Sequence, residues 1–263
     1  MLARSLLSLL LGLVLGCPSG DTGPGGDDSG DSGDTAAHDT GLDAVCSEPT
    51  EVACVDDMIS DLSLQDEKTS KGEIEPGEDG DDHLDAVDAS AGGYSNASKN
   101  AYLYAKFTDA GLEKVELTDE EALESMDWDI AARRFIVRLN GGSSGPSCVG
   151  AAAVEGQTYA EAQEVPDGVE YQMDDFYDED CDIKEDNRGL PGNPDVALGA
   201  WWTYPDTCVA TTDQAFFVQL ADGRVVKLAI ETYYAEDGQE ECNADGSTSA
   251  EGGYLTVRWR FVN

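Results

Sequence analysis

The chain has 263 residues, of which 55 are acidic and only 15 are Lys or Arg, so its formal net charge is −40. This charge argues against nucleic acid as a partner, because a protein that binds a phosphate backbone must supply cations to displace its counterions. It also argues against electrostatic attraction to an anionic membrane surface. We interpret the acidic surface as a solvating coat.

The first seventeen residues have the pattern of a signal for export. Arg4 precedes an apolar run over residues 6–15, and Gly16 stands directly before Cys17. A single cation, a short apolar run and a small residue at its end are typical of a signal peptide, and the run is short for a membrane-spanning helix. The pattern resembles the lipobox of bacterial lipoproteins. That resemblance implies a signal peptide over residues 1–16 and a lipid attached to Cys17, which then anchors the protein to a membrane outside the cytoplasm.

Residues 17–45 are predicted to form a disordered acidic tether after the signal. They are rich in Gly, Asp, Ser and Thr and have almost no apolar side chains to bury. Such a segment cannot form a core, and its like charges keep it extended. Pro18 follows the cysteine where an Asp would resemble a signal for retention in the inner membrane, so we expect the bacterial outer membrane or cell surface.

Six further cysteines follow the tether, an even number that suggests three disulfides in an oxidising compartment. Six cysteines allow fifteen pairings, and spacing alone favours only Cys46 with Cys54. The other pairings stay open. No CxxC pair is present and the chain has two histidines, so no zinc site is expected. The six residues are Cys46, Cys54, Cys148, Cys181, Cys208 and Cys242.

The pattern from residue 72 onwards favours extended structure. Two short strands are predicted, over 72–75 and from His83 to Ala89, around a turn at 77–80. Residues 101–107 form a run rich in aromatic side chains that is typical of a strand.

A short helix is expected over residues 119–125, because Thr118 and Glu121 have the spacing of a capping box. Extended structure resumes over 128–139, and the glycines and serines of 140–145 indicate a turn. Residues 157–210 are the least regular part of the chain.

The last third of the chain has the clearest alternation. Residues 216–220 and 226–230 alternate around Ala221-Asp-Gly223, which predicts a β-hairpin. In the last strand four apolar residues share one face, and we expect that strand to be paired inside the sheet. The four are Leu255, Val257, Trp259 and Phe261. Together the elements predict a single, mainly β, antiparallel domain over residues 46–263, with one or two short helices and disulfide staples.

Three blocks of sequence, in order, resemble the HmuY family of bacterial lipoproteins, whose best-studied members bind haem. The resemblance spans residues 84–263. The blocks are Val87-Asp-Ala-Ser with Tyr102-Leu-Tyr-Ala-Lys-Phe107; Met126-Asp-Trp-Asp-Ile-Ala131 with 138–145; and 217–234 with 253–261. The resemblance implies a mostly β fold, a membrane-tethered location and a role in haem binding for iron acquisition, with haem or a haem-carrying protein as partner.

The ligand set that the resemblance implies is not obvious in this chain. The founding member holds iron with two histidines, whereas this chain has only His38 and His83, both outside the region between the second and third blocks. A methionine thioether is an alternative iron ligand. The candidates are Met173 and Met126, with Trp201, Trp202 and Tyr204 as apolar faces for a porphyrin, although all five also fit a role in packing.

No catalytic motif stands out, so an enzyme is not predicted. A GxSxG elbow, an HExxH helix and a phosphate-binding loop are all absent from the sequence. Two functional hypotheses follow. The first is a haem-binding lipoprotein, and the second is a lipoprotein of the same fold that binds or interacts at the surface without haem.

Overall fold

The structure is a computed structural model that describes residues 45–90, 93–186, 190 and 192–262. The predicted signal peptide, Cys17 and all of the predicted tether except Val45 lie outside the described residues. The described part falls within one compact unit, Thr40–Asn263. No helix in this part is long and apolar enough to cross a membrane.

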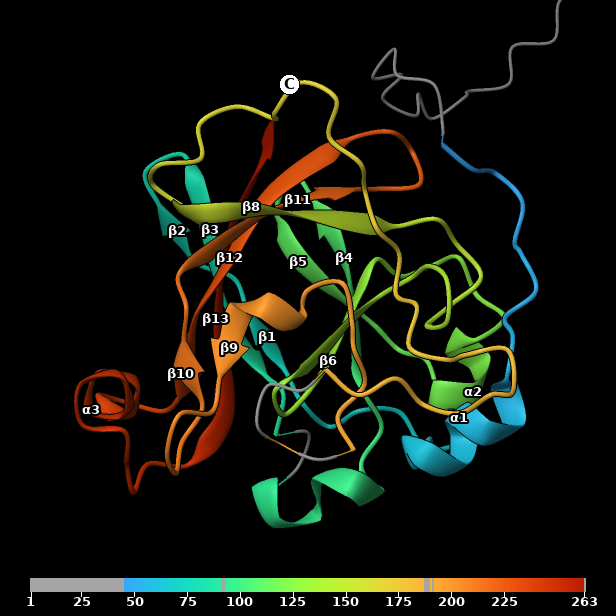
Figure 1. Ribbon diagram of the computed structural model, residues 1–263, viewed down its shortest axis with the longest axis horizontal. Helices are drawn as coiled ribbons and strands as arrows, with labels where there is room; N and C mark the ends of the chain where they lie inside the picture. The colour runs from blue at the N-terminus through green and yellow to red at the C-terminus, as the bar shows by residue number, and fades with distance from the viewer. Residues whose placement is uncertain (1–44, 91–92, 187–189, 191, 263) are drawn as a thin grey trace, which may run out of the picture. The chain divides into compact units, whose positions relative to one another are not determined.

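Short strands dominate the described part, with three α-helices and two 3₁₀ helices between them (Figure 1). The helices are α1 Val55–Asp61, α2 Asp119–Ala122, α3 Gly238–Asp245, η1 Tyr94–Lys99 and η2 Gly199–Trp201. The strands are β1 Ile74–Glu75, β2 Glu78–Asp79, β3 Asp82–Asp88, β4 Leu103–Thr108, β5 Gly111–Val115, β6 Ile130–Arg133, β7 Ile136–Leu139, β8 Gly150–Thr158, β9 Trp202–Thr203, β10 Ala210–Thr211, β11 Gln214–Gln219, β12 Val225–Tyr234 and β13 Gly252–Val262. The predicted mainly β, antiparallel fold is confirmed.

Two antiparallel sheets carry most of the strands. The larger sheet has seven strands in the order β1-β3-β13-β12-β11-β8, with β2 also paired to β3. The smaller sheet has the order β5-β4-β6-β7. The last strand, β13, lies between β12 and β3, as the alternation predicts.

The main hydrophobic core contains side chains from both sheets. Strand alternation sends Leu103 and Phe107 from the smaller sheet, and Leu228, Val257 and Trp259 from the larger sheet, into one cluster. Trp259 is completely buried and its ring meets Phe107 edge-on, with 4.9 Å between the ring centroids. The sheets are therefore held together by the residues that the sequence pattern places on one face.

A second hydrophobic cluster covers the other face of the smaller sheet. Tyr102 and Tyr104 alternate with the main-core residues of β4 and point to this side, where they meet Met58 of α1 and Ala122 of α2. The indole Nε1 of Trp128 donates to the Ala122 carbonyl at 2.9 Å, which fixes α2 on the sheet. The predicted capping box of α2 is present between Thr118 and Glu121.

The structure corrects the predicted disulfide. Cys46 pairs with Cys148 and Cys54 pairs with Cys181, so the Cys46–Cys54 pairing is wrong. Cys208 pairs with Cys242. Short spacing favours a local loop, but each of these cysteines bonds to a distant segment of the chain. The sequence separations are 102 residues for Cys46–Cys148 and 127 residues for Cys54–Cys181.

Buried aspartates fix several loops to the sheets. Asp85 accepts hydrogen bonds from the Trp259 indole at 2.7 Å and from the Leu112 amide at 2.8 Å. Asp119 accepts from the amides of Gln65 and Tyr102, each at 2.8 Å. These carboxylates are fully buried, so their hydrogen bonds offset a large desolvation cost.

Asp129 should make the stability of the protein depend on pH between about 4 and 6. Burial raises the pKa of Asp129 from 3.8 to about 6. Because the folded state then binds more protons than the unfolded state, stability falls as pH rises through this window and is constant above it. Asp129→Asn keeps an acceptor for the Phe107 amide, which donates at 3.0 Å. We expect the stability of this variant, relative to the parent, to rise by up to about 3 kcal/mol between pH 4 and pH 6.

Urea unfolding of both proteins at a series of pH values checks this expectation. The useful quantity is the difference between the two free energies of unfolding, because titrations of the other acidic groups cancel in it. A difference that stays constant from pH 4 to pH 7 would contradict the assigned pKa shift.

Candidate ligand-binding site

Two of the three expected aromatic faces are buried in this structure. Trp201 and Trp202 are each only 1% exposed and belong to the main core. Trp202 packs against Phe135, with 5.0 Å between the ring centroids, and Tyr204 is half-buried against the same cluster. The burial of Trp201 and Trp202 supports the packing interpretation of these rings.

The two candidate methionine ligands lie in different environments. Met173 is 46% exposed and lies beside the turn at Gly141 and Gly142, where a Cβ on Gly142 would come within 2.0 Å of the Asp174 carbonyl oxygen. Met126 is half-buried after α2. Neither methionine lines the hollow described below.

The histidine that the structure describes packs against the core. His83 on β3 stacks on Trp259, with 4.3 Å between the ring centroids, and His38 lies outside the described residues. In the described part, no three His, Cys, Asp or Glu side chains come together to hold a metal ion.

The loop over residues 140–145 is structural. The side-chain amide of Asn140 donates from Nδ2 to the carbonyls of Ser125 and Trp128, at 3.0 and 2.8 Å. Ser144 Oγ donates to the buried carboxylate of Asp174 at 2.5 Å and accepts from Arg138 Nε at 3.1 Å. These bonds fasten the loop to the sheet, in agreement with the predicted turn.

A hollow of about 470 Å³ lies between the chain entering α1 and the helix α2. Figure 1 shows α1 and α2 side by side. The floor of the hollow is apolar, and its rim carries three glutamates. The lining residues are Pro49, Thr50, Glu51, Val52, Val55, Ile59, Glu120, Leu123, Glu124 and Pro146.

Covalent and hydrogen bonds hold this hollow open. The segment that forms one wall is tied to the domain by Cys46–Cys148 at one end and by Cys54–Cys181 at the other. Between them, the Thr50 amide and hydroxyl both donate to the Pro146 carbonyl, at 2.8 and 3.0 Å. A wall fixed in this way loses little conformational freedom when a ligand binds.

The chemistry of the hollow selects a partly apolar ligand without negative charge. Val52 and Leu123 are buried in the floor, while Val55 and Ile59 remain half-exposed. Glu51, Glu120 and Glu124 are exposed at the rim. Their carboxylates repel an anion, and the volume is in the range of small-molecule sites.

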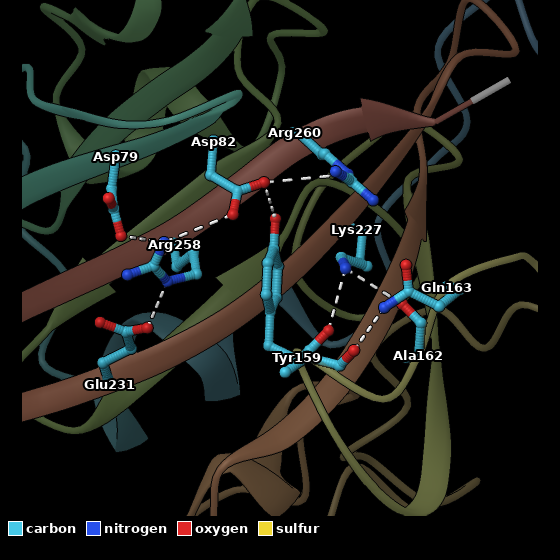
Figure 2. Close-up of polar contacts among 10 residues, drawn as sticks. Asp79, Asp82, Tyr159, Ala162, Gln163, Lys227, Glu231, Arg258 and Arg260 are labelled. Carbon is cyan, nitrogen blue, oxygen red and sulfur yellow. Dashed lines mark hydrogen bonds and ion pairs between the residues drawn. The ribbon is translucent and has the colours of Figure 1, made fainter.

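A second polar feature lies on the outer face of the larger sheet (Figure 2). Arg258 Nη1 pairs with Asp79 at 2.9 Å and with Asp82 at 3.3 Å, and its Nε pairs with Glu231. Tyr159 Oη donates to Asp82 at 2.8 Å. We call Arg258, Asp79, Asp82, Glu231 and Tyr159 the outer-face ion network.

Lys227 extends this network to the chain after β8. Its buried ammonium donates to the carbonyls of Tyr159 and Ala162, at 2.9 and 3.0 Å, and burial lowers its pKa. The cations of the network are thus satisfied by groups of the chain itself. Its role is to hold the segment after β8 and the β2–β3 hairpin on the sheet.

The HmuY protein family matches residues 98–245, more than half of the chain, and the chain belongs to that family. No curated protein matches the chain.

Solved structures resemble the chain at low sequence identity. A protein of Bacteroides vulgatus, provisionally described as HmuY-like and haem-binding, is 16% identical, with 73% of this chain and 97% of that chain covered and a TM-score of 0.43. One from Bacteroides fragilis, provisionally described as a lipoprotein, is 15% identical, with 73% and 95% covered and a TM-score of 0.43. The apo form of an HmuY analogue from Tannerella forsythia is 17% identical, with 75% and 100% covered and a TM-score of 0.39.

Proposed function

We propose that the protein is a lipid-anchored, extracytoplasmic binding protein of the HmuY family, and not an enzyme. Its ligand occupies the hollow between α1 and α2 and is small, partly apolar and without negative charge. The observation that carries this proposal is the apolar floor of the hollow, framed by two disulfides and three exposed glutamates. The disulfides also agree with an oxidising compartment.

Anchoring rests on the sequence Leu15-Gly16-Cys17 and is tested separately from binding. Wild-type protein and Cys17→Ser are expressed in a bacterium that is fed an alkyne analogue of palmitate. We expect label and detergent-phase partitioning for the wild type and neither for Cys17→Ser. Equal labelling of the two proteins would contradict a lipid on Cys17. Outer-membrane location is then read from membrane fractionation.

Binding in the hollow is tested with a neutral apolar dye, N-phenyl-1-naphthylamine, on residues 40–263. Val55→Asp places a charge on the floor of the hollow. Val55 is half-exposed and is the first residue of α1, where an acidic side chain is favourable to the helix. We expect a saturable rise in fluorescence that is at least about tenfold weaker in Val55→Asp, which corresponds to about 1.4 kcal/mol.

Ala53→Asp is the matched control for this experiment. Ala53 is exposed, two residues away, and does not line the hollow, so the variant adds the same charge to the same segment. Its affinity for the dye should equal that of the parent. Equal losses in both variants would show a general charge effect and would contradict binding in the hollow.

Haem, the ligand that family membership implies, does not fit the residues of the hollow. The lining offers no imidazole, thioether or thiolate as an iron ligand, and its glutamates repel the propionates. Outside the hollow, Met173 supplies an exposed thioether. We therefore expect a haem titration of residues 40–263 to give a flat, non-saturating Soret response under oxidising and reducing conditions. A saturable band at one haem per chain that Met173→Ala abolishes would restore haem as the ligand.

A further inference from the structure

A second hollow, of about 480 Å³, lies on the outer face of the larger sheet, away from the residues that line the first. Strand register shows how it forms. Ala86 on β3 pairs with Thr256 on β13, and Thr256 pairs with Thr232 on β12. These three small side chains make a low floor across neighbouring strands. Glu75 of β1 continues the row, because it pairs with Ala86.

Two tyrosines stand beside this floor. Tyr254 on β13 points outward, because Leu255 and Val257 take the inward positions, and it is 36% exposed. Tyr234 ends β12 and lines the same hollow. Tyr254 is one of only three large hydrophobic side chains that are exposed in the described part of the chain. An exposed aromatic ring over a floor of small residues offers a π face to a ligand.

Carboxylates surround the tyrosines. Glu75 and Glu236 line the hollow, and neither side chain makes a hydrogen bond or ion pair with any described residue. Asp88 accepts from the amide of Ser90 at 3.0 Å, and Glu73 is within 3.5 Å of Lys114. The hollow therefore has a negative rim, of which two members are free to pair with a ligand.

Arg258 does not cancel this charge. Arg258 is the next outward residue of β13 after Thr256, and the outer-face ion network surrounds it with Asp79, Asp82 and Glu231 (Figure 2). The network as a whole is close to neutral, because Arg260 also pairs with Asp82, at 3.8 Å, and Lys227 lies beside Tyr159. The negative charge that attracts a cation to the hollow is therefore that of the rim itself, above all that of Glu75 and Glu236.

We propose that this hollow binds a small, soluble organic cation with an alkylated ammonium group. The ammonium lies against the ring of Tyr254 and pairs with Glu75 and Glu236, while its alkyl groups cover Ala86 and the threonine methyls. Cation–π attraction and carboxylate pairing act on the same group only if the ligand is a cation with an apolar surface. The volume admits a molecule of this size. The site is separate from the hollow between α1 and α2 and does not depend on the function proposed for it.

Choline and its neutral isostere, 3,3-dimethylbutan-1-ol, are the probes for isothermal titration calorimetry with the full chain in a non-ionic detergent. The two probes have nearly the same shape and differ in charge. We expect saturable binding of choline, weakened by added salt, and at least tenfold weaker binding of the alcohol. Equal binding of the two, or no saturation by choline, would overturn the proposal.

Variants of the hollow separate the ring from the charge. Tyr254→Phe keeps the π face and should bind choline within about twofold of the parent, whereas Tyr254→Leu should bind about threefold to fivefold more weakly, as expected for an exposed cation–π contact. Glu236→Gln should weaken choline binding and reduce its dependence on salt. Glu240→Gln, an exposed residue of α3 outside the lining, is the matched control and should match the parent. Equal affinities of the Leu and Phe variants would contradict the role of Tyr254.

Discussion

Trp259→Ala should lower the free energy of unfolding by about 3–5 kcal/mol, the range for truncation of a large core aromatic residue. Trp259 is completely buried where β13 faces the smaller sheet. Its ring packs edge-on to Phe107 and stacks on His83. Its Nε1 donates to the buried carboxylate of Asp85, so the variant also leaves part of that charge without a donor. Chemical denaturation of the oxidised protein measures the loss.

Trp259→Phe separates the two contributions. The smaller ring keeps most of the apolar contact but loses the bond to Asp85, so an intermediate loss of about 1–3 kcal/mol is expected. A loss below about 1 kcal/mol in Trp259→Ala would contradict the position of this residue at the centre of the core.

Removing the Cys54–Cys181 disulfide should cost about 4 kcal/mol in the chain-entropy description, because with Cys46–Cys148 intact the bond closes a loop of about 40 residues. The Cys208–Cys242 bond closes a separation of 34 and should cost about 4 kcal/mol. The paired Cys→Ser variants are compared by denaturation in the absence of reductant.

The two disulfide variants should also differ in binding. Loss of Cys54–Cys181 frees one end of the wall of the hollow between α1 and α2, so the affinity for N-phenyl-1-naphthylamine should fall. Loss of Cys208–Cys242, which joins the segment before β10 to α3, should leave that affinity unchanged. Equal affinities in the two variants would contradict a preformed wall.

Regular alternation made much of the sheet predictable from sequence. The hairpin of β11 and β12 pairs Phe216 with Leu228 and Val218 with Val226, as the period of two on each side of the Ala221-Asp-Gly223 turn indicates. The central place of β13 followed from the same pattern. The capping box predicted the start of α2 because a side chain there must satisfy the free amides of the first turn.

Long-range pairing could not be predicted in this way. Spacing carries no information about which distant segments approach each other. It therefore favours a bond between Cys46 and Cys54, whereas each of these residues pairs with a cysteine more than a hundred positions away. The roles of Trp201 and Trp202 depend on the same missing information. The sequence around them fits equally well a pocket wall and a buried core.

The buried aspartates left a partial signal. Asp85 lies two residues before Val87 on β3, so both side chains point to the inward face of the sheet. An acidic residue is ordinarily expected to be exposed to solvent, and the strand pattern alone therefore gives conflicting indications for Asp85. The hollow between α1 and α2 left no signal, because its lining comes from residues 49–59, 120–124 and 146, and only the fold brings these together.

The most direct measurement is a titration of residues 40–263, labelled on the methyl groups of Val, Leu, Ile and Met, with N-phenyl-1-naphthylamine by NMR. Chemical-shift changes that saturate together and are confined to Val52, Val55, Ile59 and Leu123 would confirm the hollow between α1 and α2 as the ligand site. Changes centred on Met173, or the absence of saturable changes, would contradict it.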